Sequence, residues 1–208
     1  MDKLVQHLKN LGVLKEPNII AAFGAIDRKD FVLPDYREAA YEDYPLPIGS
    51  GQTISQPYTV AFMLELLQPK SGEKILDVGS GSGWTTALLA HIVGSKGYVY
   101  GTEIISELVA FGQRNLAKYQ LPQAQIVQAT PPTGEAGKKL GMAQEAPFDR
   151  ILASAAADSL PKELVEQLKV GGILVIPVRN DILQVRKISK TKTAIQKYPG
   201  FMFVPLIE

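Results

Sequence analysis

The segment that most constrains the fold of this chain is Lys74 to Trp84, which reads K-I-L-D-V-G-S-G-S-G-W. Its first part, Ile75 to Val78, is an apolar run of strand length with one acid, Asp77, inside it. Three glycines follow at alternate positions: Gly79, Gly81 and Gly83. After Trp84 the apolar residues recur at helical spacing. Glycine allows positive φ and close approach of a ligand, and a helix N-terminus offers free N–H groups. The segment therefore predicts a strand, a glycine turn and a helix that form a nucleotide-type pocket.

A second acid supports this interpretation. The β-prone run Tyr98–Glu103 ends in a carboxylate twenty residues after Gly83. At this distance the next parallel strand brings an acid to the ribose hydroxyls of a ligand held by the glycine loop. The G-x-G-x-G spacing, with Asp77 two residues before the first glycine, differs from the G-x-G-x-x-G of dehydrogenases. It resembles motif I of the S-adenosylmethionine-dependent methyltransferases, in which Glu103 would be the acid that ends the second strand.

Strand and helix patterns alternate along the chain, which predicts an α/β fold. We expect a doubly wound, mostly parallel Rossmann-like methyltransferase sheet with helices on both faces. A length of 208 residues fits one methyltransferase domain, 1–208. Within it, residues 1–57 would form an N-terminal cap of helices and a substrate loop, and residues 58–208 the cofactor-binding core.

Composition excludes several other classes of protein. The chain has 22 Lys and Arg against 21 Asp and Glu, so it lacks the charge typical of nucleic-acid or membrane binding. Cysteine is absent and only two histidines are present, so we expect no disulfide and no metal site. The first residues lack the apolar core of a signal peptide, and no segment approaches the length of a membrane span. We expect a cytoplasmic monomer that binds neither nucleic acid nor membrane.

Several elements outside the glycine segment can be predicted from periodicity. Helices are expected near residues 4–11 and 19–26 and from Tyr58 to Leu67. The segment Tyr44–Pro57 matches no regular pattern and predicts a long irregular loop, a kind that is often functional in compact domains. A later helix would begin at Leu160-Pro161 and end at Gly171-Gly172. Pro131 to Gly134 indicates a loop, and Phe201–Leu206 is expected to form the final strand.

Three segments, taken in order, resemble the protein-L-isoaspartate O-methyltransferase family. They are D-R-K-D-F-V-L-P from Asp27, A-Y-E-D-Y-P-L-P-I-G-S-G-Q-T-I-S-Q-P from Ala40, and I-L-D-V-G-S-G-S-G-W from Ile75. The alanine triplet after Ser154 and the closing F-V-P-L are also similar to that family. The match covers most of the chain. The resemblance implies methyl transfer from S-adenosylmethionine, with S-adenosylhomocysteine as product, to the free α-carboxylate of L-isoaspartyl residues in damaged proteins and peptides. The methyl ester then closes to a succinimide, which starts repair.

The resemblance also implies roles for particular residues. The cofactor would be bound by these residues: Thr53, Ile54, Asp77, Gly79, Ser80, Gly81, Gly83 and Glu103. Glu103 would take the ribose hydroxyls, and Asp77 would order the loop or bind the amino group. Ser55 resembles the active-site serine of the family and would orient the substrate carboxylate as the catalytic residue. The remaining substrate-binding residues would be Tyr58, Val204, Pro205 and Leu206.

Three positions depart from the family pattern. Gln128-Ala129-Thr130 stands where the family places G-D-G, whose acid contacts the adenine amino group. Tyr58 replaces the usual histidine after Pro57, and Arg179-Asn180-Asp181 replaces the usual glycine. These differences leave two alternatives open: a methyltransferase that acts on another acceptor, and a non-catalytic binding protein that has lost turnover.

Overall fold

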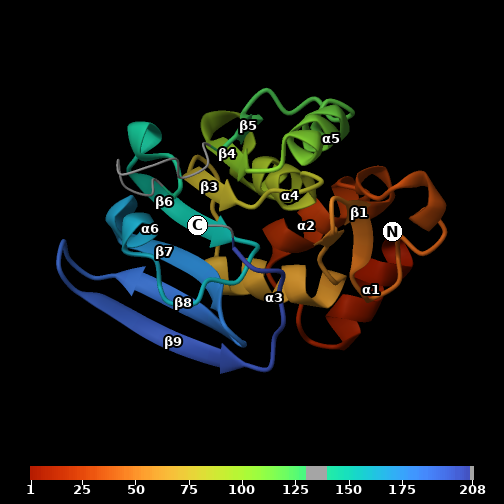
Figure 1. Ribbon diagram of the computed structural model, residues 1–208. Helices are drawn as coiled ribbons and strands as arrows, with labels where there is room; N and C mark the ends of the chain where they lie inside the picture. Colours follow the sequence, from red (N-terminus) through yellow and green to blue (C-terminus); the bar gives the residue numbers. More distant parts are fainter. Residues whose placement is uncertain (130–139, 207–208) are drawn as a thin grey trace.

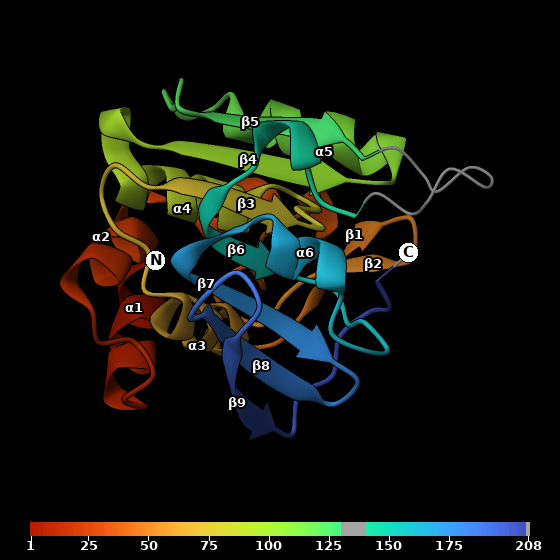
Figure 2. The same cartoon turned by 90° about the vertical axis from the view of Figure 1, so that its left-hand side faces the viewer.

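The computed structural model describes residues 1–129 and 140–206. Seven strands form one sheet in the order β5-β4-β3-β6-β7-β8-β9, which Figure 2 shows from top to bottom. The strands are β3 (Lys74–Val78), β4 (Tyr98–Glu103), β5 (Ala124–Gln128), β6 (Phe148–Ala153), β7 (Leu168–Val178), β8 (Asp181–Lys187) and β9 (Thr193–Pro199). The pairs from β5 to β7 are parallel, and β8 and β9 are antiparallel. The expected doubly wound, mostly parallel sheet is therefore confirmed.

Helices lie on both faces of this sheet (Figure 1). The α-helices among the described residues are α1 (Asp2–Asn10), α2 (Pro17–Ala25), α3 (Pro57–Leu67), α4 (Trp84–Val93), α5 (Ser106–Leu116) and α6 (Lys162–Glu166). Short 3-10 helices span Arg28–Phe31, Pro34–Tyr36, Gly94–Lys96 and Ala143–Glu145. Within the described ranges, no helix combines the length and the apolar composition needed to cross a membrane.

The two faces of the sheet carry separate apolar cores because consecutive strand residues point in opposite directions. Ile75 of β3 belongs to the larger core, into which α1 to α5 pack. Its neighbour Leu76 belongs to the smaller core beneath α6, together with Leu164. A strand that is buried on both faces is mainly apolar, which explains the run that follows Lys74, with Asp77 as its one polar residue.

The N-terminal helices pack on other helices: α1 contacts α2 and α3, and α2 contacts α3 and α4. Figure 1 shows α1, α2 and β1 together at the right of the sheet. Phe23 of α2 meets Trp84 at the start of α4 in an edge-to-face contact, with ring centroids 5.5 Å apart. This contact joins α2 to the start of α4, the helix that follows the glycine segment.

The structure corrects the prediction of an irregular loop over Tyr44–Pro57, because part of this segment forms a hairpin. β1 (Leu46–Gly49) and β2 (Gln52–Ile54) pair antiparallel. The turn between them has positive φ at Gly49, Ser50 and Gly51. The strands are only four and three residues long and contain Pro47, so a period-2 pattern cannot develop in the sequence.

The structure also corrects the prediction of a helix that reaches Gly171-Gly172. α6 ends at Glu166, and β7 begins at Leu168, before the glycines. Lys187 Nζ donates to the carbonyl oxygens of Val165, Glu166 and Leu168 at 2.8, 3.0 and 2.7 Å, which satisfies the end of the helix. The glycine pair lies instead at an irregularity between β6 and β7.

The expected final strand at Phe201–Leu206 is wrong as well. The last strand is β9, an exposed edge strand whose apolar and polar residues are nearly all solvated, so it gives a weak sequence signal. The following segment forms only an isolated bridge between Ala156 and Pro205. The predicted loop at 131–134 lies outside the described residues.

The close contact of α5 with the glycine loop gives a testable prediction. A Cβ atom at Gly112 would lie 2.8 Å from Ile126 Cδ1 and 2.9 Å from the Gly81 carbonyl oxygen, whereas a Cβ at Gly24 meets nothing within 4 Å. We expect Gly112→Ala to cost about 1 to 3 kcal/mol of unfolding free energy through overpacking. The matched helical change Gly24→Ala should be neutral or stabilise by up to about 1 kcal/mol. Thermal denaturation of both variants checks this, and equal midpoints would contradict it.

Candidate active site

The glycine loop follows β3 without a break and turns back over the start of α4. Gly79, Gly81 and Gly83 have φ values of 73°, 51° and 87°. Side chains other than glycine rarely adopt these values. At Gly83 a Cβ would also lie 2.9 Å from Ile126 Cδ1 and 3.1 Å from the Gly112 carbonyl oxygen. Position 83 therefore needs glycine both for its backbone angle and for packing.

Glu103 at the end of β4 holds this loop. Its Oε2 accepts a hydrogen bond from the Gly81 N–H at 2.9 Å. Its Oε1 accepts from the N–H groups of Ile104 and Ile105 at 2.7 and 3.0 Å. A carboxylate offers about four acceptor positions, so these three bonds leave about one free. Glu103 thus shapes the loop, and contact with two ribose hydroxyls would require bonds to be shared or exchanged.

Asp77 lies fully buried beneath the loop. Its Oδ2 accepts from the hydroxyls of Thr85 and Thr86 at 2.7 and 2.6 Å. Its Oδ1 is buried without a hydrogen-bond partner in the described part of the chain, as is Ser80 Oγ. Burial raises the pKa of Asp77 to about 6; the bonds from Thr86 and Thr85 oppose this rise, and the charge of Glu103 adds to it. A cation near the free oxygen would satisfy the carboxylate and lower this pKa.

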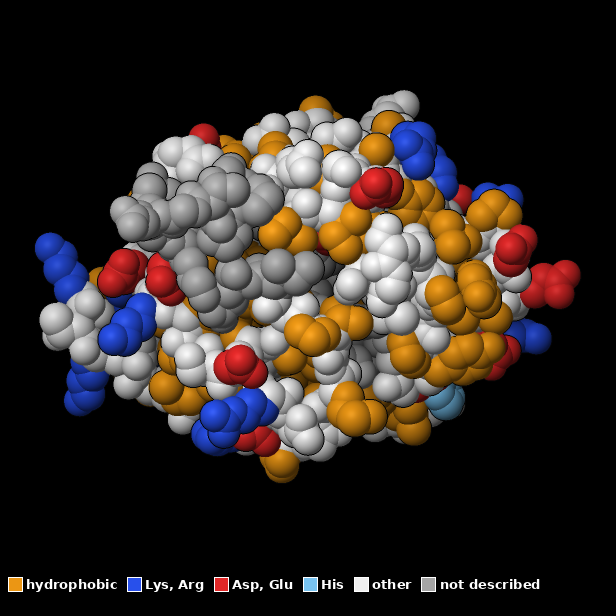
Figure 3. Space-filling view, viewed as in Figure 1, with side chains coloured by type: hydrophobic (Ala, Val, Ile, Leu, Met, Phe, Trp, Pro, Cys, Tyr) orange, Lys and Arg blue, Asp and Glu red, His pale blue; other side chains and the backbone are white. Residues whose placement is uncertain are grey.

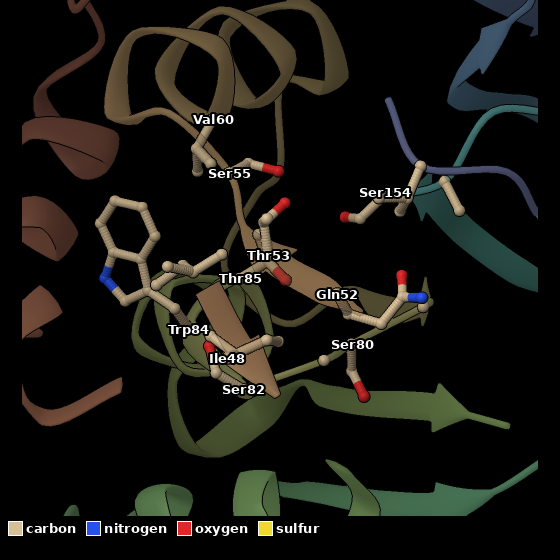
Figure 4. A pocket seen from close by; sticks show the side chains of 15 residues that line it. Ile48, Gln52, Thr53, Ser55, Val60, Ser80, Ser82, Trp84, Thr85 and Ser154 are labelled. Atoms are coloured by element: carbon tan, nitrogen blue, oxygen red, sulfur yellow. The ribbon is translucent and has the colours of Figure 1, made fainter. Parts of the chain in front are cut away.

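A cleft opens between the glycine loop, the β1–β2 hairpin and the end of β6 (Figure 4). Its lining residues are Ile48, Gln52, Thr53, Ile54, Ser55, Val60, Gly79, Ser80, Gly81, Ser82, Trp84, Thr85, Ser154, Ala155 and Val204. Some of the predicted site residues in this lining, such as Thr53 and Val204, are more than 100 residues apart in the sequence. The fold therefore brings the glycine loop, the T-I-S segment and one residue of the closing F-V-P-L segment to one place.

Other predicted residues lie outside this lining. Asp77, Gly83 and Glu103 stand behind the loop, where they shape it. Tyr58 donates its N–H to Asp43 Oδ1 at 2.8 Å, and its ring stacks on Phe62. This ring borders a separate depression that also includes Tyr198 and Val13.

Pro205 and Leu206 also lie outside the lining, next to Val204. The Ala156 N–H donates to the Val204 carbonyl oxygen, and the Leu206 N–H donates to the Ala156 carbonyl oxygen, both at 2.8 Å. Because strand residues alternate in direction, the carbonyl of Pro205 points to the opposite edge. Pro205 is exposed and has no N–H group, so on this edge it offers its carbonyl oxygen alone.

Sequence reasoning missed several polar side chains of the cleft. In Figure 4 the hydroxyl of Ser154 points across the cleft toward Thr53, and Ser55 lies on the same side as Thr53. Ser154 directly follows β6, at the carboxyl edge of the parallel sheet where ligands of such sheets bind. That position is the signal that could have identified it. Gln52 could be found only once the hairpin was known.

The described residues that line the cleft are all uncharged, and Asp77 and Glu103 stand behind the glycine loop. Among residues 1–129 and 140–206, no three His, Asp or Glu side chains are placed to hold a metal ion. On the face in Figure 3, hydrophobic side chains gather over the N-terminal elements at the right, and Lys and Arg lie mainly toward the edges. Hydroxyl groups in such a cleft can donate hydrogen bonds to an anionic ligand, for which these bonds are stronger than for a neutral one.

Ala129 follows β5 at the position where the resembling family has an acid. Its N–H donates to the Glu103 carbonyl oxygen at 2.8 Å, so this backbone lies directly beside the predicted ribose-binding residue. Its methyl group carries no hydrogen-bonding capacity. The neighbouring Thr130 lies outside the described residues.

Comparisons with known proteins agree with this geometry. The family described as protein-L-isoaspartate(D-aspartate) O-methyltransferase matches residues 1–208. A protein of that name from Pyrobaculum islandicum is 42% identical over 207 residues, which cover 98% of this chain and 97% of the relative. Another, from Methanopyrus kandleri, is 42% identical over 210 residues, with 99% and 90% covered.

A solved structure supports the same assignment. A Plasmodium falciparum protein-L-isoaspartate O-methyltransferase, in complex with S-adenosyl-L-homocysteine, superposes with a TM-score of 0.84 at 26% identity. The alignment covers 98% of this chain and 96% of that one. From the matching motifs, fold and cleft, the chain belongs to the protein-L-isoaspartate O-methyltransferase family.

Proposed function

We propose that this protein transfers a methyl group from S-adenosylmethionine to the free α-carboxylate of L-isoaspartyl residues in damaged proteins and peptides. The observation that carries the proposal is the neutral, hydroxyl-lined cleft between the glycine loop and the β1–β2 hairpin. Family membership over the whole chain supports the same reaction. The resulting ester would close to a succinimide and hydrolyse in part to normal aspartate, which initiates repair.

The reaction requires little proton transfer. A carboxylate oxygen attacks the methyl carbon in line, the carbon–sulfur bond breaks, and the sulfonium becomes a neutral thioether. An α-carboxylate is already ionised at neutral pH, so no general base is needed. Alignment and exclusion of water can supply about 7 to 11 kcal/mol. Among the described residues, no histidine, cysteine or charged side chain lines the cleft, which suits such a reaction.

The cofactor fits the glycine loop because two buried oxygens there lack partners within the described residues, Asp77 Oδ1 and Ser80 Oγ. S-adenosylmethionine would supply the activated methyl group. Gly79, Ser80 and Gly81 would lie against its methionine part, and Glu103 would face the ribose. Thr53 and Ile54 would cover the reacting centre from the hairpin side.

The acceptor would lie between the hairpin and the closing segment. Ser55 would donate its hydroxyl to the substrate carboxylate, and Ser154 faces the same space. The carbonyl oxygen of Pro205, which points away from Ala156, would accept a hydrogen bond from an extended peptide. The proposed contribution of Tyr58 would have to come from the rim, because its ring borders the neighbouring depression.

The wider setting is also part of this proposal. Its partners would be isoaspartyl-containing proteins and peptides, and it would act as a cytoplasmic monomer without binding nucleic acid or membrane. Residues 1–57 would serve as cap and substrate loop, and residues 58–208 as the cofactor-binding core of one domain. The edge-to-face contact of Phe23 with Trp84 supports the view that cap and core fold as one unit.

The test of the proposed function is transfer of labelled methyl to a peptide that contains isoaspartate, beside the same peptide with normal aspartate. We expect base-labile label on the first peptide alone. Label on neither, by a protein that still binds S-adenosylhomocysteine, would point to another acceptor. Failure to bind S-adenosylhomocysteine as well would favour a non-catalytic protein, which the uncharged Ala129 keeps as the second candidate.

Ser55→Ala tests the proposed catalytic residue. Loss of one hydrogen bond to a charged group is worth about 1.5 to 3 kcal/mol, so we expect kcat/KM for the peptide to fall about 10- to 100-fold. The affinity for S-adenosylhomocysteine, measured by calorimetry, should change less than about twofold. Ser95→Ala is the control, because Ser95 is exposed in the 3-10 helix that precedes β4. Turnover of Ser55→Ala equal to that of the control would remove Ser55 from the mechanism.

The raised pKa of Asp77 predicts pH-dependent cofactor binding. Above about pH 6 the carboxylate is ionised and attracts the amino group of S-adenosylhomocysteine, which stays protonated between pH 5 and 7. As the pH falls through about 6, Asp77 gains a proton and affinity should decline. Asp77→Asn keeps the shape, and we expect it to weaken binding at pH 7 about tenfold or more and to remove this pH dependence.

Calorimetric titration from pH 5 to 7 measures both effects. Asp149→Asn is the matched control, because Asp149 accepts from Lys74 N and Lys169 Nζ at the opposite end of the strands. An affinity of the wild-type protein that stays constant across this range would contradict the role of Asp77.

A further inference from the structure

Arg28 is a buried cation that does not line the cleft and forms no close ion pair with another described residue. It begins the 3-10 helix Arg28–Phe31 and has no exposed surface. Burial lowers the pKa of its guanidinium to about 10, while Asp43 and Tyr44 oppose the shift. The side chain therefore remains charged at neutral pH. Burial of a charge is costly unless hydrogen bonds compensate it, so its bonding pattern shows what it stabilises.

The guanidinium binds four backbone carbonyl oxygens. Nη1 donates to Ala40 O at 3.0 Å and to Glu42 O at 3.1 Å. Nη2 donates to Tyr44 O and Ser55 O, both at 3.0 Å. These acceptors flank the β1–β2 hairpin, with Tyr44 before it and Ser55 after it. The planar fork of Arg28 thus ties together the two ends of the segment that carries Thr53 and Ser55.

The same guanidinium also contacts the cofactor side of the cleft. Its central carbon lies 5.5 Å from the ring centroid of Trp84, a cation–π distance. Trp84 follows the glycine loop, and its side chain borders the cleft with Ser55 (Figure 4). Arg28 therefore lies behind the cleft and bridges the hairpin to the first turn of α4.

We propose that Arg28 is a positioning residue for methyl transfer, which holds the acceptor-binding hairpin at a fixed distance from the glycine loop. This inference rests on the proposed function for its kinetic consequence. Arg28 binds the main chain of Ser55, so the hydroxyl of that residue stays free to face the cleft. An in-line displacement is sensitive to misplacement of about 1 Å, which can cost about 100-fold in rate. Arg28 would set the separation of donor and acceptor without contacting either of them.

Arg28→Lys tests the inference, because lysine keeps the charge but has only three donors and no planar fork. We expect kcat/KM for the isoaspartyl peptide to fall about 10- to 100-fold, mainly through kcat. The dissociation constant of S-adenosylhomocysteine should stay within about twofold. Both measurements are made well below the unfolding midpoint of each variant.

Arg150→Lys is the matched control. Arg150 is also a buried arginine that binds backbone carbonyls, with Nε 2.9 Å from Leu67 O and Nη2 3.0 Å from Glu73 Oε1. It lies in β6, and neither it nor these partners line the cleft. This variant should lose stability as Arg28→Lys does, yet keep kcat/KM within about twofold of the wild type.

A second measurement is independent of activity. Trp84 is the single tryptophan of the chain, so its fluorescence reports on the bridge to Arg28. We expect a changed emission maximum and stronger acrylamide quenching in folded Arg28→Lys, and neither change in Arg150→Lys. This readout holds even if the wild type does not methylate isoaspartate, a result that would overturn the proposed function alone.

Several outcomes would overturn the positioning role itself. Equal kinetic losses in the two arginine variants would mean that both act through stability. Wild-type turnover and fluorescence in Arg28→Lys would show that the hairpin needs no guanidinium. A parallel loss of S-adenosylhomocysteine affinity would assign Arg28 to the cofactor side, and failure of Arg28→Lys to fold at any temperature would assign it to the stability of the whole chain.

Discussion

The close approach of the glycine loop to helix α5 is the constraint on which the rest of the site depends. Gly83 and Gly112 lie so near each other that a Cβ atom on either would collide with the backbone of the other segment or with Ile126. This contact fixes where the first turn of α4 lies relative to β4 and β5. The Gly81 N–H can then reach Glu103, and the loop becomes a rigid wall. A site for an extended ligand can be built against such a wall at little entropic cost on binding.

Charge in this protein is arranged in layers around a neutral cleft. Asp77 and Glu103 lie behind the glycine loop, and Arg28 lies behind the hairpin. Each is held by hydrogen bonds to backbone or hydroxyl groups rather than by close ion pairing. Buried charges that bind backbone and hydroxyl groups in this way orient the main chain, while the described side chains that line the cleft are uncharged. This separation suits a transfer from a cation to an anion, in which charge disappears as the bond forms.

The sequence was most informative where the site is local. The segment from Lys74 to Trp84 and the acid Glu103 could be predicted because a glycine pattern and a strand-end carboxylate follow directly from backbone sterics and parallel-sheet geometry. The hairpin at residues 46–54 and the strand β9 could not, since short or exposed strands leave no periodic signal. Ser154 could have been predicted from its place at the carboxyl edge of the sheet, whereas Arg28 had no such signal, because its four acceptors are backbone carbonyls that any residue can supply.

The two halves of the cleft differ in how they are built, which explains why only one could be predicted from the sequence. The proposed cofactor half is made by one stretch of strand, turn and helix, with support from the next strand. The proposed acceptor half is assembled from the hairpin, the end of β6 and the closing segment at Val204, which meet only after the chain has folded. Its geometry therefore depends on long-range bonds such as those from Arg28 to Ser55 and from Ala156 to Val204. Because a methyl transfer needs both halves at one fixed separation, the residues that join them control the rate without touching either reactant.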